Sequence, residues 1–312
     1  MEKLIDISTY PVKPVLDMLL MDKTTKKHIV FATSSYAHLG SRYEESSHID
    51  PDLLVGLDAM ELQPRVLKEA ANQAARTRKR AEVMTPAWIV NKMNNHCDEE
   101  WFGYPDVFNK EDGQRWITNP EPIKFPEGKT WQQYVDSMRL EITCGEAPYL
   151  VSRYDTTTGE AIPVKERIGL LDRKLRVVGE NTNTKEEWLK WATRAFQSVY
   201  GYEYQGDNLL IGRINLLVTF VDYMVDHWGI KPTESEIRRL ANIIAWNLWQ
   251  MDGLTGTVPF GFREMTYQQL SMFDFPSDME NSKAVLEAIP CIIFDWRSRV
   301  PIVFNSMKEM TA

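Results

Sequence analysis

The sequence predicts an α/β fold, namely a partial doubly wound parallel sheet with helices on its faces. Helical patterns alternate with short strand-like runs through the C-terminal two thirds of the 312-residue chain, as is typical of parallel sheets. In addition, residues 140–150 (LEITCGEAPYL) combine a strand with a turn of small residues. Turns of this kind present backbone N–H groups to a ligand, so we expect a binding site there.

Composition indicates a soluble globular protein. Hydrophobic residues make up 43% of the chain and charged residues 26%, and the net charge is −8, which argues against non-specific coating of nucleic acid. The N-terminal MEKLIDISTY lacks the apolar core of a signal peptide, and no apolar run approaches the roughly 20 residues of a membrane helix. The three cysteines lie far apart in no metal-binding spacing. We therefore expect a cytoplasmic protein without a metal site and without membrane contact.

Residues 1–80 are expected to form a separate N-terminal region, α/β or mostly helical. Within it, residues 28–35 (HIVFATSS) are typical of a short buried strand, and residues 63–80 predict a helix rich in Ala, Lys, Arg and Glu. This helix would end on a basic run. The run is either a solvated helix end or a patch that contacts nucleic-acid phosphates, and its residues are Arg76, Arg78, Lys79 and Arg80.

Residues 81–312 are expected to form the second domain. Thr85 and Pro86 suit the cap and the first turn of a helix that runs to about residue 102. Three stretches predict loops or connections, and residues 148–150 could open a helix. The loops are at 103–128, 155–183 and 255–288, the helices at 185–197, 207–228 and 234–247, and the strands at 140–142, 198–204, 248–254 and 291–296.

Acidic residues follow two of these strands. In a doubly wound sheet, ligands bind outside the carboxyl ends of the strands, where Glu203 and Asp252 are expected. A carboxylate after the second strand can accept hydrogen bonds from the two hydroxyls of a ribose, and a carboxylate after the third strand can accept one from an adenine amino group. Gly145 would let the backbone approach the ligand closely. A single acid after a strand is usually a solvated turn residue, but this order of features favours a nucleoside-cofactor site.

Four segments resemble motifs of one family, the S-adenosylmethionine-dependent DNA adenine-N6 methyltransferases that serve as modification subunits of restriction systems. The segments are AEVMTPAWIVNKM, LEITCGEAPYLVSRY, VYGYEYQGDNLLIGRINLLVTF and NLWQMDGL, and the resemblance covers about residues 63–305. It implies a Rossmann-like domain that binds S-adenosylmethionine. It further implies roles for eight residues: Thr85 and Pro86 against the methionine part, Glu141, Thr143, Gly145 and Ala147 along the cofactor loop, Glu203 on the ribose, and Asp252 at the adenine amino group. Tyr204 and Trp249 lie beside the two acids in the sequence, where a ring could pack on the adenine.

The chain departs from this family in two places. Ala147 stands where the second glycine of the cofactor loop is expected, and a positive φ there would cost about 1 kcal/mol or more. The catalytic Asn/Asp-Pro-Pro-Tyr/Phe motif is absent, since the nearest matches, NPEP at 119–122 and TVPF at 257–260, lack paired prolines. We therefore expect a cofactor-binding modification-subunit-like protein that needs a partner for DNA binding and catalysis. The alternatives are a non-catalytic module that senses S-adenosylmethionine or interferes with a restriction system, and a decayed fragment.

The resemblance also bears on assembly. Family members order their strands 3-2-1-4-5, whereas this chain offers candidates for the first three only. The first strand would then be an exposed apolar edge, which proteins normally cover. The strand at 28–35, a second copy of the chain, or a separate protein with the catalytic half would each cover it.

Overall fold

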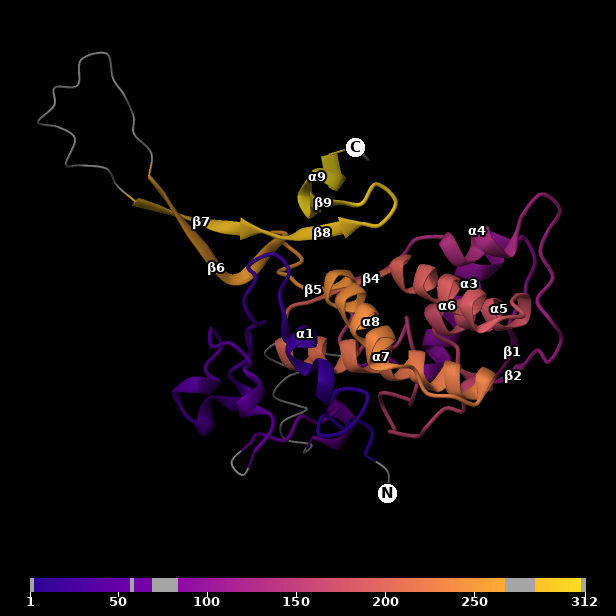
Figure 1. The fold of residues 1–312 in the computed structure, drawn as a ribbon, viewed down its shortest axis with the longest axis horizontal. Coiled ribbons are helices and arrows are strands. Elements are labelled where there is room, and N and C mark those ends of the chain that lie inside the picture. Colours follow the sequence, from indigo (N-terminus) through magenta and orange to yellow (C-terminus); the bar gives the residue numbers. More distant parts are fainter. Residues whose placement is uncertain (1–2, 57–58, 69–83, 267–283, 310–312) are drawn as a thin grey trace, which may run out of the picture.

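The structure, a computed structural model, describes residues 3–56, 59–68, 84–266 and 284–309 (Figure 1). Its centre is a parallel sheet of three short strands, β3 (Arg139–Glu141), β4 (Val199–Glu203) and β5 (Leu248–Gln250), in the order β3-β4-β5. Three antiparallel two-stranded sheets accompany it. The predicted α/β class is thus confirmed, together with the parallel pairing of the three predicted strands.

Four helices form the connections of the parallel sheet. They are α5 (Leu170–Asn181) and α6 (Lys185–Gln197) between β3 and β4, and α7 (Gly206–Trp228) and α8 (Glu234–Asn247) between β4 and β5. Helices α6 and α8 begin where predicted because threonine caps them: the Thr184 hydroxyl accepts from Glu187 N–H, and Thr233 forms a capping box with Glu236. Helix α7 is long and apolar enough to cross a membrane, but 83% of its most apolar window is buried in the protein, as in a core helix.

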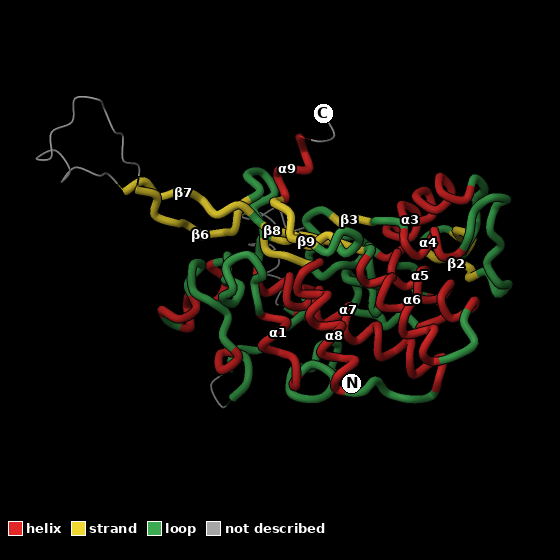
Figure 2. The backbone as a smooth tube through the Cα atoms, turned by 45° about the horizontal axis from the view of Figure 1, so that its top comes forward, coloured by secondary structure: helices red, strands yellow, loops and turns green. Residues whose placement is uncertain are grey.

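The two faces of the sheet carry different cores. Along β4, the side chain of Val199 belongs to the main core with the helices, whereas those of Tyr200 and Tyr202 pack on a second, smaller cluster. That cluster contains Trp249 of β5 and residues of the C-terminal elements β8 (Ile292–Asp295), β9 (Val300–Val303) and α9 (Phe304–Glu309). In Figure 1 the β8–β9 hairpin lies above β4 and β5 and α8 lies below them, and in Figure 2 α7 and α8 lie below β3 and the hairpin.

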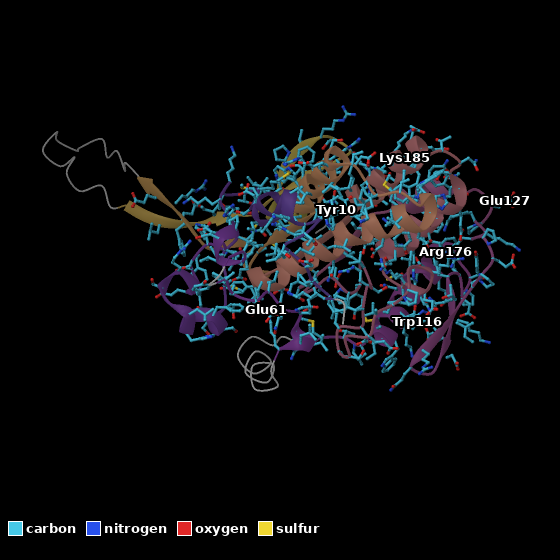
Figure 3. All side chains as sticks on the ribbon, turned by 60° about the horizontal axis from the view of Figure 1, so that its bottom comes forward. Tyr10, Glu61, Trp116, Glu127, Arg176 and Lys185 are labelled. Carbon is cyan, nitrogen blue, oxygen red and sulfur yellow. The ribbon has the colours of Figure 1, made fainter. Side chains whose placement is uncertain are left out.

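The N-terminal residues pack into the main core rather than forming a separate one. Their elements are short: η1 (Lys13–Val15), α1 (Leu16–Leu20), η2 (Ser34–Leu39), η3 (Ser41–Tyr43), η4 (Pro51–Leu53) and η5 (Arg65–Leu67). Leu19 and Phe31 are fully buried in the same cluster as α7 and α8. The Tyr10 hydroxyl (labelled in Figure 3) also donates to the Pro232 carbonyl, 2.8 Å away, just before α8. One hydrophobic core therefore spans the predicted boundary near residue 80.

The strand predicted at 28–35 is not a strand of the parallel sheet. His28 and Val30 form only isolated bridges, to Met21 and His48. The Gln250 amide at the end of β5 instead accepts from Val30 N–H and donates to Val30 O. This segment therefore lies beside β5, at the opposite edge from β3, and it does not cover the first strand.

Several segments predicted as loops contain regular elements. Residues 103–128 include the hairpin of β1 (Asn109–Asp112) and β2 (Arg115–Thr118), and residues 255–288 include β6 (Thr257–Thr266) and β7 (Ala284–Pro290). The connection at 155–183 holds η6 (Val164–Glu166) and α5. The glycines that suggested loops mark hairpin turns, as Gly113 does at φ +62°. The helix start predicted at 148–150 is also wrong, because these residues form a turn.

Two predicted helices differ from expectation at their ends. Of the helix predicted at 63–80, the described part contains only η5, and the rest lies outside the described residues, as do Arg76, Arg78, Lys79 and Arg80. Helix α3 (Ala87–Phe102) ends where predicted, but Thr85 does not cap it. Instead the Asp155 carboxylate accepts from Ala87 N–H at 2.7 Å. Helix α4 (Trp131–Asp136) was not predicted.

The outer edge of β3 is open in the described part of the chain. Arg139 N–H donates to Ser198 O next to β4, so the backbone groups of Leu140 point to the other side, where no described strand pairs with them. The apolar side chains along this edge are also exposed, by 60% for Met138, 48% for Leu140 and 63% for Ile142. The described geometry of this edge matches the exposed apolar edge that was predicted.

Candidate functional site

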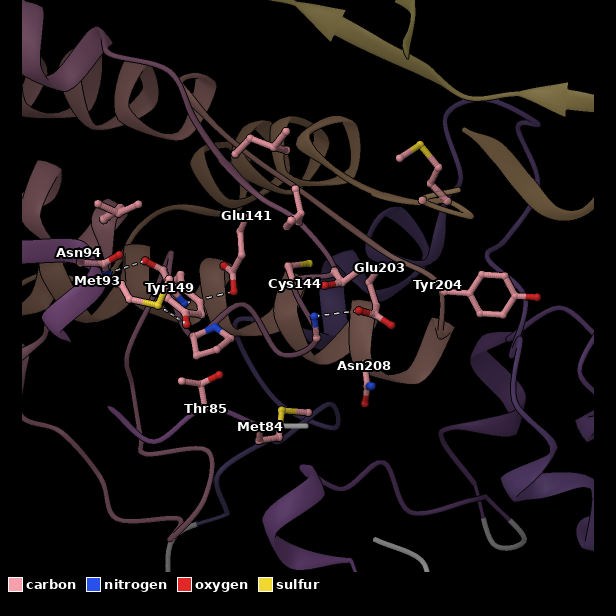
Figure 4. Close-up of a pocket in the computed structure, with 18 of the residues that line it drawn as sticks. Met84, Thr85, Met93, Asn94, Glu141, Cys144, Tyr149, Glu203, Tyr204 and Asn208 are labelled. Carbon is pink, nitrogen blue, oxygen red and sulfur yellow. Dashed lines mark hydrogen bonds between the residues drawn. The ribbon is translucent and has the colours of Figure 1, made fainter. Parts of the chain in front are cut away.

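A cavity of about 920 Å³ lies at the carboxyl ends of the parallel strands (Figure 4). The turn after β3, the residues after β4 and β5, and one side of α3 form its walls. This is the place where doubly wound sheets bind ligands. Its size is in the range of cofactor and substrate pockets.

The turn after β3 is built from unusual backbone conformations. Thr143, Gly145 and Ala147 have φ values of +46°, +53° and +64°. Glycine adopts this region freely, whereas threonine and alanine each pay about 1–2 kcal/mol. The free-energy cost that was predicted for a positive φ at Ala147 therefore applies. Such strain persists only where the surroundings hold it, and Ala147 is fully buried beneath the turn.

Glu203 ties this turn to the end of β4. Its Oε2 accepts from Gly145 N–H at 2.9 Å, and its Oε1 accepts from Gln205 N–H at 3.0 Å. The side chain lines the cavity, and the residue is only 7% exposed. Because each carboxylate oxygen can accept about two hydrogen bonds, Glu203 can hold the turn and still accept from the hydroxyls of a ligand.

Glu141, the last residue of β3, holds the far side of the same turn. Its two oxygens accept from Tyr149 N–H at 3.3 Å and Leu150 N–H at 3.1 Å. Burial raises the pKa of this carboxyl to about 8, although the two N–H groups lower the pKa and the nearby charge of Glu203 raises it further. At neutral pH, Glu141 is therefore mainly protonated.

The electrostatic character of the cavity is acidic. Its described lining contains the carboxyls of Glu141 and Glu203, together with His96, and neither lysine nor arginine. Cys144 lies between the two acids, and burial together with their charges raises the pKa of its thiol well above the usual value. The described walls therefore favour a ligand with positive charge and hydroxyl groups over one with phosphates.

The structure brings most of the predicted site residues together. Thr85, Glu141, Thr143, Gly145, Glu203 and Tyr204 line the cavity. Three others lie outside the lining. Pro86 is the residue just before α3, Ala147 is buried under the turn, and the Asp252 carboxylate accepts hydrogen bonds from Leu254 N–H and Thr255 N–H in its own turn.

Sequence analysis missed the contribution of α3. Met93, Asn94, His96 and Cys97 line the cavity from this helix. The Asn94 amide donates to the Tyr149 and Ile168 carbonyls, so it also fixes the turn (Figure 4). The spacing of 93, 94 and 97 on one helix face was visible in the sequence. What the sequence did not show was that this face turns toward the end of β3.

Comparison with known proteins adds no relative. No protein-family model matches the chain, and no curated protein and no solved structure shows significant similarity to it.

Proposed function

We propose that the cavity binds S-adenosylmethionine and that the chain is a modification-subunit-like protein, related to the DNA adenine-N6 methyltransferases of restriction systems, on a Rossmann-like cofactor domain. The observation that carries the proposal is the hydrogen bond between Glu203, at the end of the second parallel strand, and Gly145, in the turn after the first. It supports the proposal because the carboxylate that we assign to the ribose and the turn that we assign to the cofactor then line one cavity. The four sequence segments described above support the same assignment.

The charge of the cavity supports this ligand over other nucleosides. S-adenosylmethionine carries a sulfonium and an ammonium group and no phosphate, which suits walls that contain the carboxylate of Glu203 and no described lysine or arginine. A dinucleotide or a nucleoside triphosphate would bring several negative charges to Glu203. A positive charge near a buried carboxylate lowers the free energy of the complex, and a negative charge raises it by a similar amount.

Methyl transfer is a separate matter from cofactor binding. These 312 residues contain no Asn/Asp-Pro-Pro-Tyr/Phe sequence, so we propose that catalysis and binding of the duplex target site require a partner subunit. The same absence supports the second candidate function, a non-catalytic module that senses S-adenosylmethionine or interferes with a restriction system. Methyl transfer to DNA on addition of a protein that carries the missing motif distinguishes the first candidate from the second.

Calorimetric titration of S-adenosylmethionine into the purified chain tests cofactor binding. We expect binding, weakened roughly tenfold or more in Glu203→Ala because the ribose loses its acceptor. Glu187→Ala, an exposed position on α6, serves as the matched control and should bind like the wild type. Thermal unfolding of both variants shows whether they are folded. Absence of binding at millimolar cofactor, or equal binding of adenosine triphosphate, contradicts the proposal.

We further propose that a protein partner covers the open edge of β3, either a second copy of the chain or the subunit that supplies the catalytic motif. Exposed strand edges with apolar side chains pair readily with other chains. Light scattering of the purified chain should show a dimer if the cover is a second copy, and Ile142→Lys should dissociate it because a charge replaces an apolar contact. A monomer that also fails to bind any motif-bearing subunit would refute the idea.

A further inference from the structure

A second groove, of about 1000 Å³, lies at the opposite end of the parallel sheet from the cofactor cavity. Helix α4 ends at Asp136 just before β3, and α6 ends at Gln197 just before β4, so this groove is at the amino ends of the strands. Its other walls come from α8 and from the turn after β8. Lys185, labelled in Figure 3, marks the start of α6 and forms an ion pair with Glu236 of α8, 3.2 Å away.

The groove is basic in a chain of net charge −8. Four cations line it, Lys190, Arg194, Arg239 and Arg299, against two acids, Asp136 and Glu186. Asp136 is already neutralised, because it pairs with both Arg194 and the neighbouring Arg297. Lys190, Arg239 and Arg299 are exposed, and none of them forms an ion pair with another described residue. Lys190 also lies near the Trp191 ring, with its Nζ 5.7 Å from the ring centroid. Three cations can therefore meet an anion without breaking an ion pair with a described residue.

Aromatic rings alternate with these cations. Trp191 lines one wall, braced by Trp131 with ring centroids 4.8 Å apart, and Phe294 and Trp296 line the other, 4.6 Å apart. All three lining rings are half-buried. The Trp296 indole donates to the Asn247 side chain at 2.7 Å, which fixes the ring. Each wall therefore presents a rigid aromatic surface beside a positive charge.

We propose that this groove binds single-stranded nucleic acid. Half-buried rings offer stacking platforms for unpaired bases, and arginines and lysines without an ion-pair partner offer contacts for the phosphates between them. A paired duplex hides the faces of its bases and would reach the cations but not the rings. The groove shares no lining residue with the cofactor cavity, so it extends the function beyond the one proposed above.

Fluorescence anisotropy with a labelled oligothymidylate of about 16 nucleotides tests the proposal. The double variant Arg239→Glu/Arg299→Glu should weaken binding roughly tenfold or more, and lower the slope of log K against log salt by about 1.4, since each phosphate contact on a single strand contributes about 0.7. Arg238→Glu makes the same charge change one position away on α8. Arg238 pairs with Glu234 and lies against Met18, so this control should bind like the wild type.

A second variant separates stacking from charge. Trp191→Leu keeps an apolar side chain on α6 but removes the platform, and should weaken binding about tenfold without changing the salt slope. An oligouridylate run in parallel distinguishes RNA from DNA as the preferred strand, and tighter binding of either one supports the proposal. Equal binding by the double variant and the control overturns it. Equal binding of a duplex also overturns the proposal. The same holds if a proline-rich peptide binds in the groove and neither oligonucleotide does.

Discussion

Glu141→Gln is expected to gain stability relative to the wild type as the pH rises, by about 3 kcal/mol between pH 5 and pH 8. The reason is the raised pKa of Glu141, about 8 in the folded protein against 4.5 for a model carboxyl, which burial causes. In this pH window the folded wild type keeps a proton that the unfolded chain has lost. Folding therefore becomes less favourable as the pH rises, because the buried carboxyl must stay protonated or ionise without water.

The variant lacks this contribution to the pH dependence of stability, because an amide does not titrate. Its own pH dependence should therefore be flatter, although other groups such as Asp172, whose burial raises its pKa to about 6, still contribute equally to both proteins. Urea unfolding at several pH values measures the difference. Glu99→Gln, an exposed position on α3, is the control. Its free energy of unfolding should differ from that of the wild type by the same amount at every pH. Parallel curves for Glu141→Gln and the wild type would show that the carboxyl is not shifted.

Strongly periodic segments with clear caps could be predicted from the sequence. Helices α6 and α8 have the predicted bounds, and α7 begins one residue early, because apolar periodicity and the threonine caps act locally. The three parallel strands followed from their position between such helices. The site residues Glu141, Gly145 and Glu203 came with them, because a parallel sheet brings the carboxyl ends of its strands together.

Helix α5 shows why other elements could not be predicted. Its sequence, LLDRKLRVVGEN, places Asp172, Arg173 and Lys174 in a row, which suggests a solvated segment. All three are buried, since Arg173 pairs with Asp98 at 2.6 Å and the Asp172 carboxylate accepts from Ser152 N–H. These partners come from segments far away in the sequence, so the local pattern does not reveal that the charged side chains find partners inside the protein.

The cavity wall from α3 was missed for a related reason. Asn94 reaches two backbone carbonyls that follow β3, and that contact joins segments more than 50 positions apart. A short amide side chain on a helix carries no sign of such a contact in the sequence. The strained turn also depends on contacts that the local sequence does not show. The surrounding structure imposes positive φ values on Thr143 and Ala147, although the backbone of both residue types prefers negative φ.

Arg213→Met is expected to lower the free energy of unfolding by about 3–5 kcal/mol. Arg213 is fully buried on α7 and donates to the carbonyls of Leu19, Met21, Ala245 and Leu248. Burial lowers the pKa of the guanidinium to about 10, so holding the charge there is itself unfavourable. Methionine removes that cost and fills similar space, which by itself would stabilise the protein.

The loss outweighs this gain because the partners are backbone groups. Buried ion pairs can be replaced by apolar side chains when both partners change together, but no substitution removes the four carbonyls, and each unsatisfied one costs about 1–3 kcal/mol. Two of these carbonyls lie at the C-terminal end of α1 and two at the C-terminal end of α8. In the variant, the N-terminal segment should therefore also exchange its amide hydrogens faster than the rest of the protein does. Arg238→Met on the exposed side of α8 is the control, with a change near zero. A loss below about 1 kcal/mol for Arg213→Met would mean that water replaces the guanidinium in this core.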